Sequence, residues 1–228
     1  MLLALSLHAE EIYATFTVEA SQHADLAFTT TGTVEKVNVD VASVVKKGEI
    51  LAELNNEDLK AALDIATIAM KYAKRDYERQ VKVKKLVDAS KFDSYAFKYE
   101  HAKAQTAYQQ ALLDKTQLKA PFDGVIYEKS VEVGDVVSGA MIRTVMKIQS
   151  LKERKLILSV DQKYWKVLKS GLVFRYKVDG DSSVYTGKIS KVYPYANDAN
   201  RKIRAEVEAE SFTPGLFGDG YIIVPDTK

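Results

Sequence analysis

The sequence LKAPFDGVI, Leu118–Ile126, marks the point where the chain changes from helical to β structure. Pro121 cannot donate the backbone hydrogen bond that an α-helix needs, and Asp123 and Gly124 are residues that favour turns. A long segment rich in Ala, Lys, Glu and Gln precedes this stretch, and a Val-rich run follows it. The stretch therefore predicts that the chain leaves a helical region and resumes a β domain begun earlier.

The segment before this break predicts two long helices. Residues 56–115 contain no Gly or Pro, and two series of residues recur there at alternating spacings of four and three. The first series is Leu59, Leu63, Ala66, Met70, Ala73, Tyr77, Gln80 and Lys84, and the second is Phe97, His101, Ala104, Tyr108, Ala111, Lys115 and Leu118. Each series is typical of a coiled-coil seam, so we expect an antiparallel hairpin over 56–117 with its tip near 86–93.

The start of the second helix carries its own signals. Asp93 is a good N-cap residue, and Phe92 and Phe97 are spaced for a hydrophobic staple around it. The basic run from Arg79 to Lys91 is either a solvated end of the hairpin or a surface that complements a partner's charge. We favour the second interpretation.

The β-like stretches on either side of the hairpin resemble each other at an offset of 92 positions. The pattern V-x-V-x-x-V-V recurs at one spacing from a Gly, and neither half is long enough to bury an apolar face alone. The identical pairs are Gly32 with Gly124, Val39 with Val131, Val41 with Val133, Val44 and Val45 with Val136 and Val137, and Ile50 with Ile142. We expect two paired half-domains with the hairpin inserted between them, and structural turns at Gly32, Gly48, Pro121, Gly124 and Gly134.

Composition excludes several classes of protein. The formal net charge of the 228 residues is +2, which gives no support for nucleic acid as a partner. The absence of cysteine excludes disulfides, thiol catalysis and a lipidated cysteine within this sequence. Met1–Ala9 is too short to span a bilayer, and it is either the remnant of a signal peptide or a disordered end.

Several stretches resemble the periplasmic adaptors, or membrane fusion proteins, of tripartite efflux pumps (the HlyD family). The stretch GTVEKVNVDVASVVKKGEILAEL (32–54) is similar to the first half of their biotinyl-lipoyl-like domain, and TQLKAPFDGVIYEKSVEVGDVVSGAMI (116–142) to the second half. The sequence from LILSVDQ (156–162) to GLFGDGYIIV (215–224) resembles the β-barrel domain that follows. The resemblance covers the chain from about residue 12 onward.

This resemblance implies a mainly β fold with an inserted α-helical hairpin (α+β). The expected domains are a signal remnant or disordered end (1–10), an N-terminal strand joining the barrel (11–28), the first lipoyl-like half (29–55), the hairpin (56–117), the second half (118–150) and the β-barrel (151–228). The membrane-proximal domain of many adaptors is expected to be absent, since the sequence ends after the last barrel-like strand.

The resemblance also implies a docking site at the hairpin tip. Family members that bind TolC-type outer-membrane ducts tend to carry an Arg, then a Leu four residues on, then a Ser seven further. The positions here are Lys82, Leu86 and Asp93, and a one-residue shift would bring in Ser94; Ser90 also lies close by. Lys cannot reproduce the bidentate contacts of an Arg, so the docking chemistry departs from the family pattern at that position.

Nothing in the sequence favours catalysis, a metal or a cofactor. The three histidines, His8, His23 and His101, are far apart, and the hairpin occupies the point where a lipoyl or biotin carrier displays its lysine. We expect Trp165 to pack in the core of the barrel, in a short helix that plugs one end.

We therefore predict a non-enzymatic adaptor without cofactors, located in the periplasm and attached to the inner membrane through its partners. The implied partners are an inner-membrane transporter, a TolC-type duct, and further copies of the chain as a hexamer or trimer of dimers. A transporter of the resistance-nodulation-division (RND) class is favoured over an ABC exporter, because no N-terminal transmembrane helix is seen. A lipoyl-like scaffold domain of a cytoplasmic complex is the other alternative. The sequence names neither the transporter nor the exported substrate.

Overall fold

A computed structural model of the chain describes residues 10–83 and 88–225. The chain forms two compact units, one from Met1–His23 with Gln149–Lys228 and the other from Ala24–Ile148. The expected barrel segment over 11–28 is thus divided between the units, because strand β2 (His23–Leu26) lies beside β9 (Met146–Ser150) in a sheet of the second unit.

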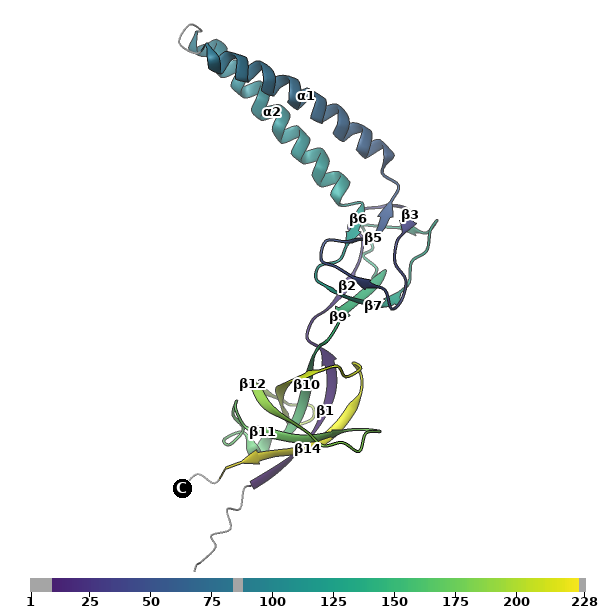
Figure 1. Cartoon of the computed structure of the whole chain (residues 1–228), viewed down its shortest axis with the longest axis vertical. Coiled ribbons are helices and arrows are strands. Elements are labelled where there is room, and N and C mark those ends of the chain that lie inside the picture. The colour runs from purple at the N-terminus through teal and green to yellow at the C-terminus, as the bar shows by residue number, and fades with distance from the viewer. Residues whose placement is uncertain (1–9, 84–87, 226–228) are drawn as a thin grey trace, which may run out of the picture. The chain divides into compact units, whose positions relative to one another are not determined.

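The first unit is a closed six-stranded β-barrel (Figure 1). Its strands, in hydrogen-bonded order, are β1 (Glu10–Ala20), β10 (Glu153–Asp161), β13 (Lys202–Glu210), β12 (Tyr185–Asn197), β11 (Val173–Val178) and β14 (Phe217–Val224). Alternate residues of β1 point inward because side chains alternate along a strand. Phe16, Phe174 and Tyr176 form the aromatic centre of the barrel core, with ring centroids 5.3–5.9 Å apart.

Trp165 does not pack in this core, contrary to the prediction. It follows the 3₁₀-helix η2 (Gln162–Tyr164), and 64% of its surface is exposed. Leu168 is buried in the barrel core instead, and the partly buried Tyr164 packs against the same core. The prediction rested on the large apolar side chain of Trp165, but the short turn directs Tyr164 and Leu168, and not Trp165, toward the barrel core.

The second unit contains two four-stranded sheets that mix strands from both half-domains. The first sheet has the order β2, β9, β7 (Gly124–Lys129) and β4 (Val44–Val45). The second has the order β6 (Gln117–Lys119), β5 (Ile50–Leu54), β3 (Gly32–Val37) and β8 (Val136–Val137). One core joins them, including Leu51, Leu54, Ile126 and Ile148, so each half covers the apolar face of the other as the sequence predicted.

The internal repeat is confirmed by reciprocal hydrogen bonds. The N–H of Ala42 donates to the carbonyl of Ile126, and the N–H of Gly134 donates to that of Val34, which are equivalent bonds at the offset of 92. Ala42 and Gly134 both have positive φ, +70° and +96°. The left-handed turn is therefore a shared feature of the repeat, built from an Ala in one half and a Gly in the other.

Two antiparallel helices are inserted between β5 and β6: α1 (Glu57–Lys82) and α2 (Ala89–Asp114) (Figure 1). The predicted seam of α1 is confirmed from Leu59 to Gln80, since these residues are half-buried or buried; Lys84 lies outside the described residues. The predicted seam of α2 is wrong, because Phe97, His101 and Tyr108 are exposed. The series of α2 that faces α1 also keeps spacings of three and four, and its members are half-buried except for the buried Leu113: Phe92, Tyr95, Tyr99, Ala102, Thr106, Gln109 and Leu113.

Several predicted boundaries and turns also differ. Helix α2 ends at Asp114, and the short strand β6 precedes Pro121, so Pro121 does not itself end the helix. Gly48 and Gly134 occupy left-handed turns, as expected. Gly32 and Gly124, however, begin strands β3 and β7, and at Gly32 an added Cβ would lie 3.1 Å from Leu54 Cδ1, so close packing rather than turn geometry favours Gly there.

Candidate docking site at the hairpin tip

The last turn of α1 and the first turns of α2 form the described part of the hairpin tip. Lys82, Ser90, Asp93 and Ser94 are all exposed there. Helix α1 ends at Lys82, and Ser90, Asp93 and Ser94 lie within the first turns of α2. Leu86, the fifth predicted docking residue, lies outside the described residues, as do Lys84 and Lys85.

Asp88, rather than Asp93, is the N-cap of α2. Its Oδ1 accepts hydrogen bonds from the N–H of Ser90 at 2.9 Å and of Lys91 at 3.4 Å. The predicted cap was placed more than a turn too late, since both aspartates are suitable capping residues. Asp93 is thereby free of the capping role, and its carboxylate is presented on the helix surface.

An aromatic cluster between α1 and α2 lies next to the tip. Tyr77 of α1 lies between Phe92 and Tyr99 of α2, with ring centroids 5.6 and 5.7 Å away. The predicted staple between Phe92 and Phe97 is therefore wrong: Phe92 faces α1, whereas Phe97 lies beside His101 on the outer face, with ring centroids 5.9 Å apart. The sequence allows this contact to be predicted, because Phe92 and Tyr99 are seven residues apart and therefore lie on one face of the helix.

The described charges at this end of the hairpin are of both signs, with Arg79, Lys82 and Lys91 beside Asp88 and Asp93. Arg79 forms an ion pair with Asp76, while Lys82 and Lys91 are exposed. Exposed charges of one sign guide the approach of an oppositely charged partner and contribute more to association rate than to affinity. The tip can therefore present cations, hydroxyl groups and carboxylates to a partner, and it has the geometry of a contact surface.

The base of the hairpin is fixed by a buried polar contact. Asn56 is fully buried and its Nδ2 donates to Thr116 Oγ1 at 2.9 Å, while Thr116 Oγ1 donates to the carbonyl of Leu113 at 2.7 Å. This contact joins the residue before α1 to the end of α2. Halfway along, Thr106 Oγ1 lies 2.9 Å from the carbonyl oxygen of Ala102 in its own helix and 3.1 Å from that of Ala66, so its one hydroxyl hydrogen is shared between the helices and Thr106 lies level with Ala66.

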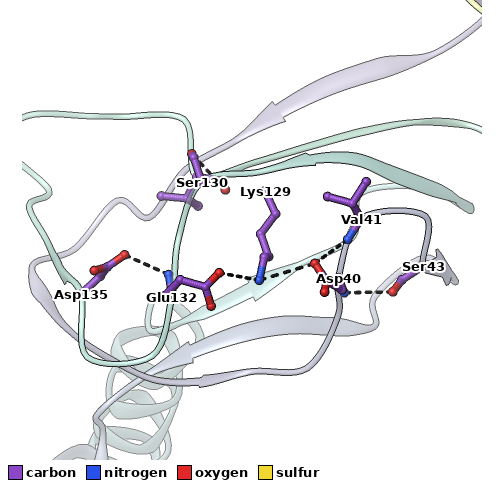
Figure 2. Close-up of polar contacts among 8 residues, drawn as sticks. Asp40, Val41, Ser43, Lys129, Ser130, Glu132 and Asp135 are labelled. Atoms are coloured by element: carbon purple, nitrogen blue, oxygen red, sulfur yellow. Dashed lines mark hydrogen bonds and ion pairs between the residues drawn. The ribbon is translucent and has the colours of Figure 1, made fainter.

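In the β part of this unit, Lys129 joins the two repeat-related turns (Figure 2). Its Nζ lies 2.8 Å from Glu132 Oε1 and 3.5 Å from Asp40 Oδ1. The hydrogen bond from the N–H of Val41, and then the charge of Lys129, lower the pKa of Asp40. The hydrogen bond with Glu132, together with Asp40, raises the pKa of Lys129 against the effect of its burial. Lys129 therefore forms an ion pair between the second half-domain and Asp40 of the first.

Within residues 10–83 and 88–225, no three His, Asp or Glu side chains lie close enough together to hold a metal ion. Neither of the two described long helices is apolar enough over a sufficient length to cross a membrane.

Comparisons with known proteins agree with this architecture. Residues 22–147 match the family described as CzcB-like, barrel-sandwich hybrid domain. The cobalt-zinc-cadmium resistance protein CzcB of Cupriavidus metallidurans is 24% identical over 208 residues, which cover 82% of this chain and 39% of that protein. An uncharacterised protein of Haemophilus influenzae is 29% identical over 144 residues, 62% of this chain and 38% of that protein. The chain thus spans about two fifths of the length of these curated relatives.

Solved structures share the fold. A MacA–MexA chimera that contains the α-hairpin domain of Pseudomonas aeruginosa MexA superposes with a TM-score of 0.85 at 20% identity, covering 97% of this chain and 84% of that one. The membrane fusion protein Spr0693 of Streptococcus pneumoniae gives a TM-score of 0.72 at 16% identity, covering 95% and 100%. The chain belongs to the CzcB-like barrel-sandwich hybrid family, within the membrane fusion, or adaptor, proteins of efflux pumps.

Proposed function

We propose that this protein is a periplasmic adaptor that oligomerises and bridges an inner-membrane transporter to a TolC-type outer-membrane duct. The observation that carries the proposal is the inserted hairpin. Its two helices have 26 residues each, so the hairpin extends about 39 Å at 1.5 Å per residue. Together with the family membership, this long, thin projection with a polar tip supports a role in reaching a distant partner.

The tip is the proposed contact with the duct. The residues that would make it are Lys82, Leu86, Ser90, Asp93 and Ser94, of which Leu86 is assigned from the sequence alone. Lys82 and Lys91 favour a duct end that is acidic, because complementary charge steers two surfaces into register. The Asp88 cap and the cluster around Tyr77 support this assignment, since they hold the start of α2 in one conformation.

The lipoyl-like parts of several copies would pack as a ring, six copies or three pairs, and the barrels would rest on the transporter. The role is structural, with no cofactor, no nucleic acid and no catalytic step. Copies attached in this way would enclose a path for the exported substrate.

The proposed transporter is of the RND class, with an ABC exporter as the alternative and a cytoplasmic lipoyl-like scaffold as the least favoured one. The similarity to the cobalt-zinc-cadmium resistance protein over 82% of the chain favours divalent metal cations among the small molecules to be tested as substrates.

The first experiment uses the absence of cysteine. Ser90→Cys in the full chain places a single reactive thiol at the tip, and Glu57→Cys places a matched, exposed thiol at the base of the same hairpin. We expect crosslinking in the intact cell envelope to join Ser90→Cys, but not Glu57→Cys, to an outer-membrane duct identified by mass spectrometry. The proposed docking site is contradicted if Ser90→Cys captures no duct. It is also contradicted if Ser90→Cys and Glu57→Cys capture the same proteins.

The second experiment identifies the transporter and the substrate class. A strain that lacks this protein is expected to become more sensitive to its exported substrate, and zinc, cobalt and cadmium salts are compared with organic antimicrobial compounds. Deleting the gene of the transporter that co-purifies with this protein should make the cells sensitive to the same compounds. An unchanged profile in both strains, with the protein found in the cytoplasm, would support the scaffold alternative.

A further inference from the structure

The outer face of α2 carries an apolar series that its own hairpin does not use. Phe97 is 69% exposed and Tyr108 is 58% exposed, and they lie on one face with His101, Ala104 and Ala111. Their spacings of four and three residues are those of a coiled-coil seam, and they belong to the series that the sequence predicts for the inside of the hairpin. Helix α2 therefore has two seams, of which the inner one packs on α1.

Helix α1 has a matching outer series. Ile65, Ile68 and Tyr72 are between 51% and 70% exposed, and Ala61 and Arg75 continue the same stripe at spacings of four and three. Single exposed apolar residues need no explanation, but a continuous stripe of them at coiled-coil spacing marks an interaction surface. Both long helices of the hairpin thus present a seam away from each other.

The two outer series are in register. The bond between Thr106 and Ala66 and the rings around Tyr77 show that residues whose numbers add to about 172 lie level on the two antiparallel helices. A neighbouring copy standing the same way up would bring its α2 antiparallel to this α1 at the same level. The level pairs are Ala61 with Ala111, Ile65 with Tyr108, Ile68 with Ala104, Tyr72 with His101, and Arg75 with Phe97.

These level pairs are complementary in size and chemistry. In this arrangement large Ile68 would meet small Ala104, and the Tyr72 and His101 rings would lie at the same level. The Arg75 guanidinium, which lies 4.6 Å from the centroid of the Tyr72 ring in its own helix, would also come level with Phe97, a favourable cation–π partner. Such alternation of large and small residues allows two helices to pack closely.

The charges beside the stripe are complementary in its middle. Lys71 lies level with Glu100, and Asp76 lies level with Lys98, so each level pair has opposite charges. Within the chain, Glu100 also pairs with Lys103 and Asp76 with Arg79, so the pairs between copies would share these carboxylates. At the base end, Glu57 and Asp114 carry like charges, but Asp114 is neutralised by Lys119, whose Nζ lies 3.0 Å from its Oδ1. Charge complementarity therefore favours this register near the centre of the hairpin.

We propose that the outer stripe of α1 binds the outer stripe of α2 of a second copy of this chain, in the register that pairs Ile68 with Ala104. The contact is heterologous, since two different surfaces meet, and such a contact forms a ring when the rotation from copy to copy closes on itself. The proposal rests on the proposed function, because it specifies how neighbouring adaptors would pack, and it adds the surface and the register.

The test is disulfide crosslinking between two differently marked full-length chains, co-expressed so that the cell envelope and its partners are present. One chain carries Ile68→Cys and the other Ala104→Cys, and no native cysteine competes. A disulfide needs its Cβ atoms about 4 Å apart, so only residues that truly face each other crosslink. We expect the Ile68→Cys and Ala104→Cys chains to form a heterodimer on mild oxidation.

The matched control moves one thiol along the same face. Ala111→Cys lies seven residues from Ala104, about 10 Å along the helix, so Ile68→Cys should crosslink to it at least about tenfold less. The preference should reverse with Ala61→Cys, which is level with Ala111. Equal yields for both partners, predominant Ile68→Cys homodimers, or no crosslink from either pair each overturn the proposed contact.

This result is separable from the proposed function. If the register fails while Ser90→Cys still captures a duct, the adaptor role stands and the packing of hairpins is wrong. If the register is found but the tip captures no duct, the hairpins assemble for another purpose.

Discussion

The buried contact at the base of the hairpin allows a quantitative prediction. Thr116→Val keeps the shape of the side chain but removes the hydroxyl group that accepts from Asn56 Nδ2 and donates to the carbonyl of Leu113. Among the described residues, Asn56 Oδ1 already has no hydrogen-bond partner, so the variant leaves both polar atoms of this fully buried side chain unpaired. The newly unpaired group is Asn56 Nδ2, since the carbonyl of Leu113 still accepts from the backbone N–H of Thr116 at 3.0 Å. A newly unpaired buried group costs about 1–3 kcal/mol, so Thr116→Val should lower stability by about that amount.

The assay is urea unfolding of the full chain with two signals. Helical circular dichroism reports the unit that contains α1 and α2, whereas fluorescence of Trp165, the single tryptophan, reports the barrel. We expect Thr116→Val to shift the helical transition to lower urea and to leave the Trp165 transition in place. Thr116→Ser keeps the hydroxyl group and should cost less than about 1 kcal/mol, through the lost methyl group.

Two results would refute this reasoning. One is a Thr116→Val protein whose helical transition lies within about 0.5 kcal/mol of the parent, the range of an ordinary surface substitution. The other is additivity in a double-mutant cycle with Asn56→Ala, since residues that share a buried hydrogen bond should be coupled by more than about 0.5 kcal/mol.

Three further predictions concern the turns and the barrel. Gly134→Ala should destabilise the second unit by about 1 kcal/mol, because a φ of +96° is unfavourable for a residue with a side chain. Ala42→Gly, at a φ of +70°, should stabilise the same unit by about 0.5 kcal/mol. Urea unfolding followed by helical circular dichroism measures both changes, and stability changes of the same sign in the two variants would contradict the shared turn. Gly220→Ala should destabilise the barrel by more than about 2 kcal/mol, seen in Trp165 fluorescence, because its Cβ would overlap the backbone of Arg175 and Tyr176. Hydrogen bonding from Tyr193, and then Lys191, lowers the pKa of Glu206, so the stability that this carboxylate contributes is present above its unfolded pKa and is lost as pH falls through its folded pKa. Barrel stability measured from roughly pH 2 to 5 should therefore fall less steeply in Glu206→Gln than in the parent, and parallel curves would exclude this contribution.

Much of the fold follows from the sequence because its signals are local and repeated. The Val pattern at an offset of 92 positions predicts two paired half-domains, and the equivalent bonds of Ala42 and Gly134 confirm them. The inner seam of α1 is predicted because its residues are the only series of that helix with Leu at both early positions, Leu59 and Leu63.

The errors have a common physical cause. Helix α2 carries two series with the same spacing, and Phe97 and Tyr108 are as apolar as Phe92 and Tyr99, so periodicity cannot tell which face meets α1. That choice is made by tertiary contacts, such as the bond from Thr106 to Ala66. Burial of a single residue is decided in the same way, which explains the exposed Trp165.

The inner seam of the hairpin is weak for its length, and this links its stability to assembly. Gln80, Thr106 and Gln109 occupy seam positions, whereas helices in proteins gain most of their stability from tertiary packing of an apolar face. If the outer stripes bury Ile68, Tyr72 and Phe97 between copies, assembly supplies the missing apolar burial. The helical transition should then rise to higher urea as protein concentration increases, whereas the Trp165 transition should not move. Concentration-independent unfolding of the helices would mean that the hairpin is stable without its neighbours, and the outer stripes would need another partner.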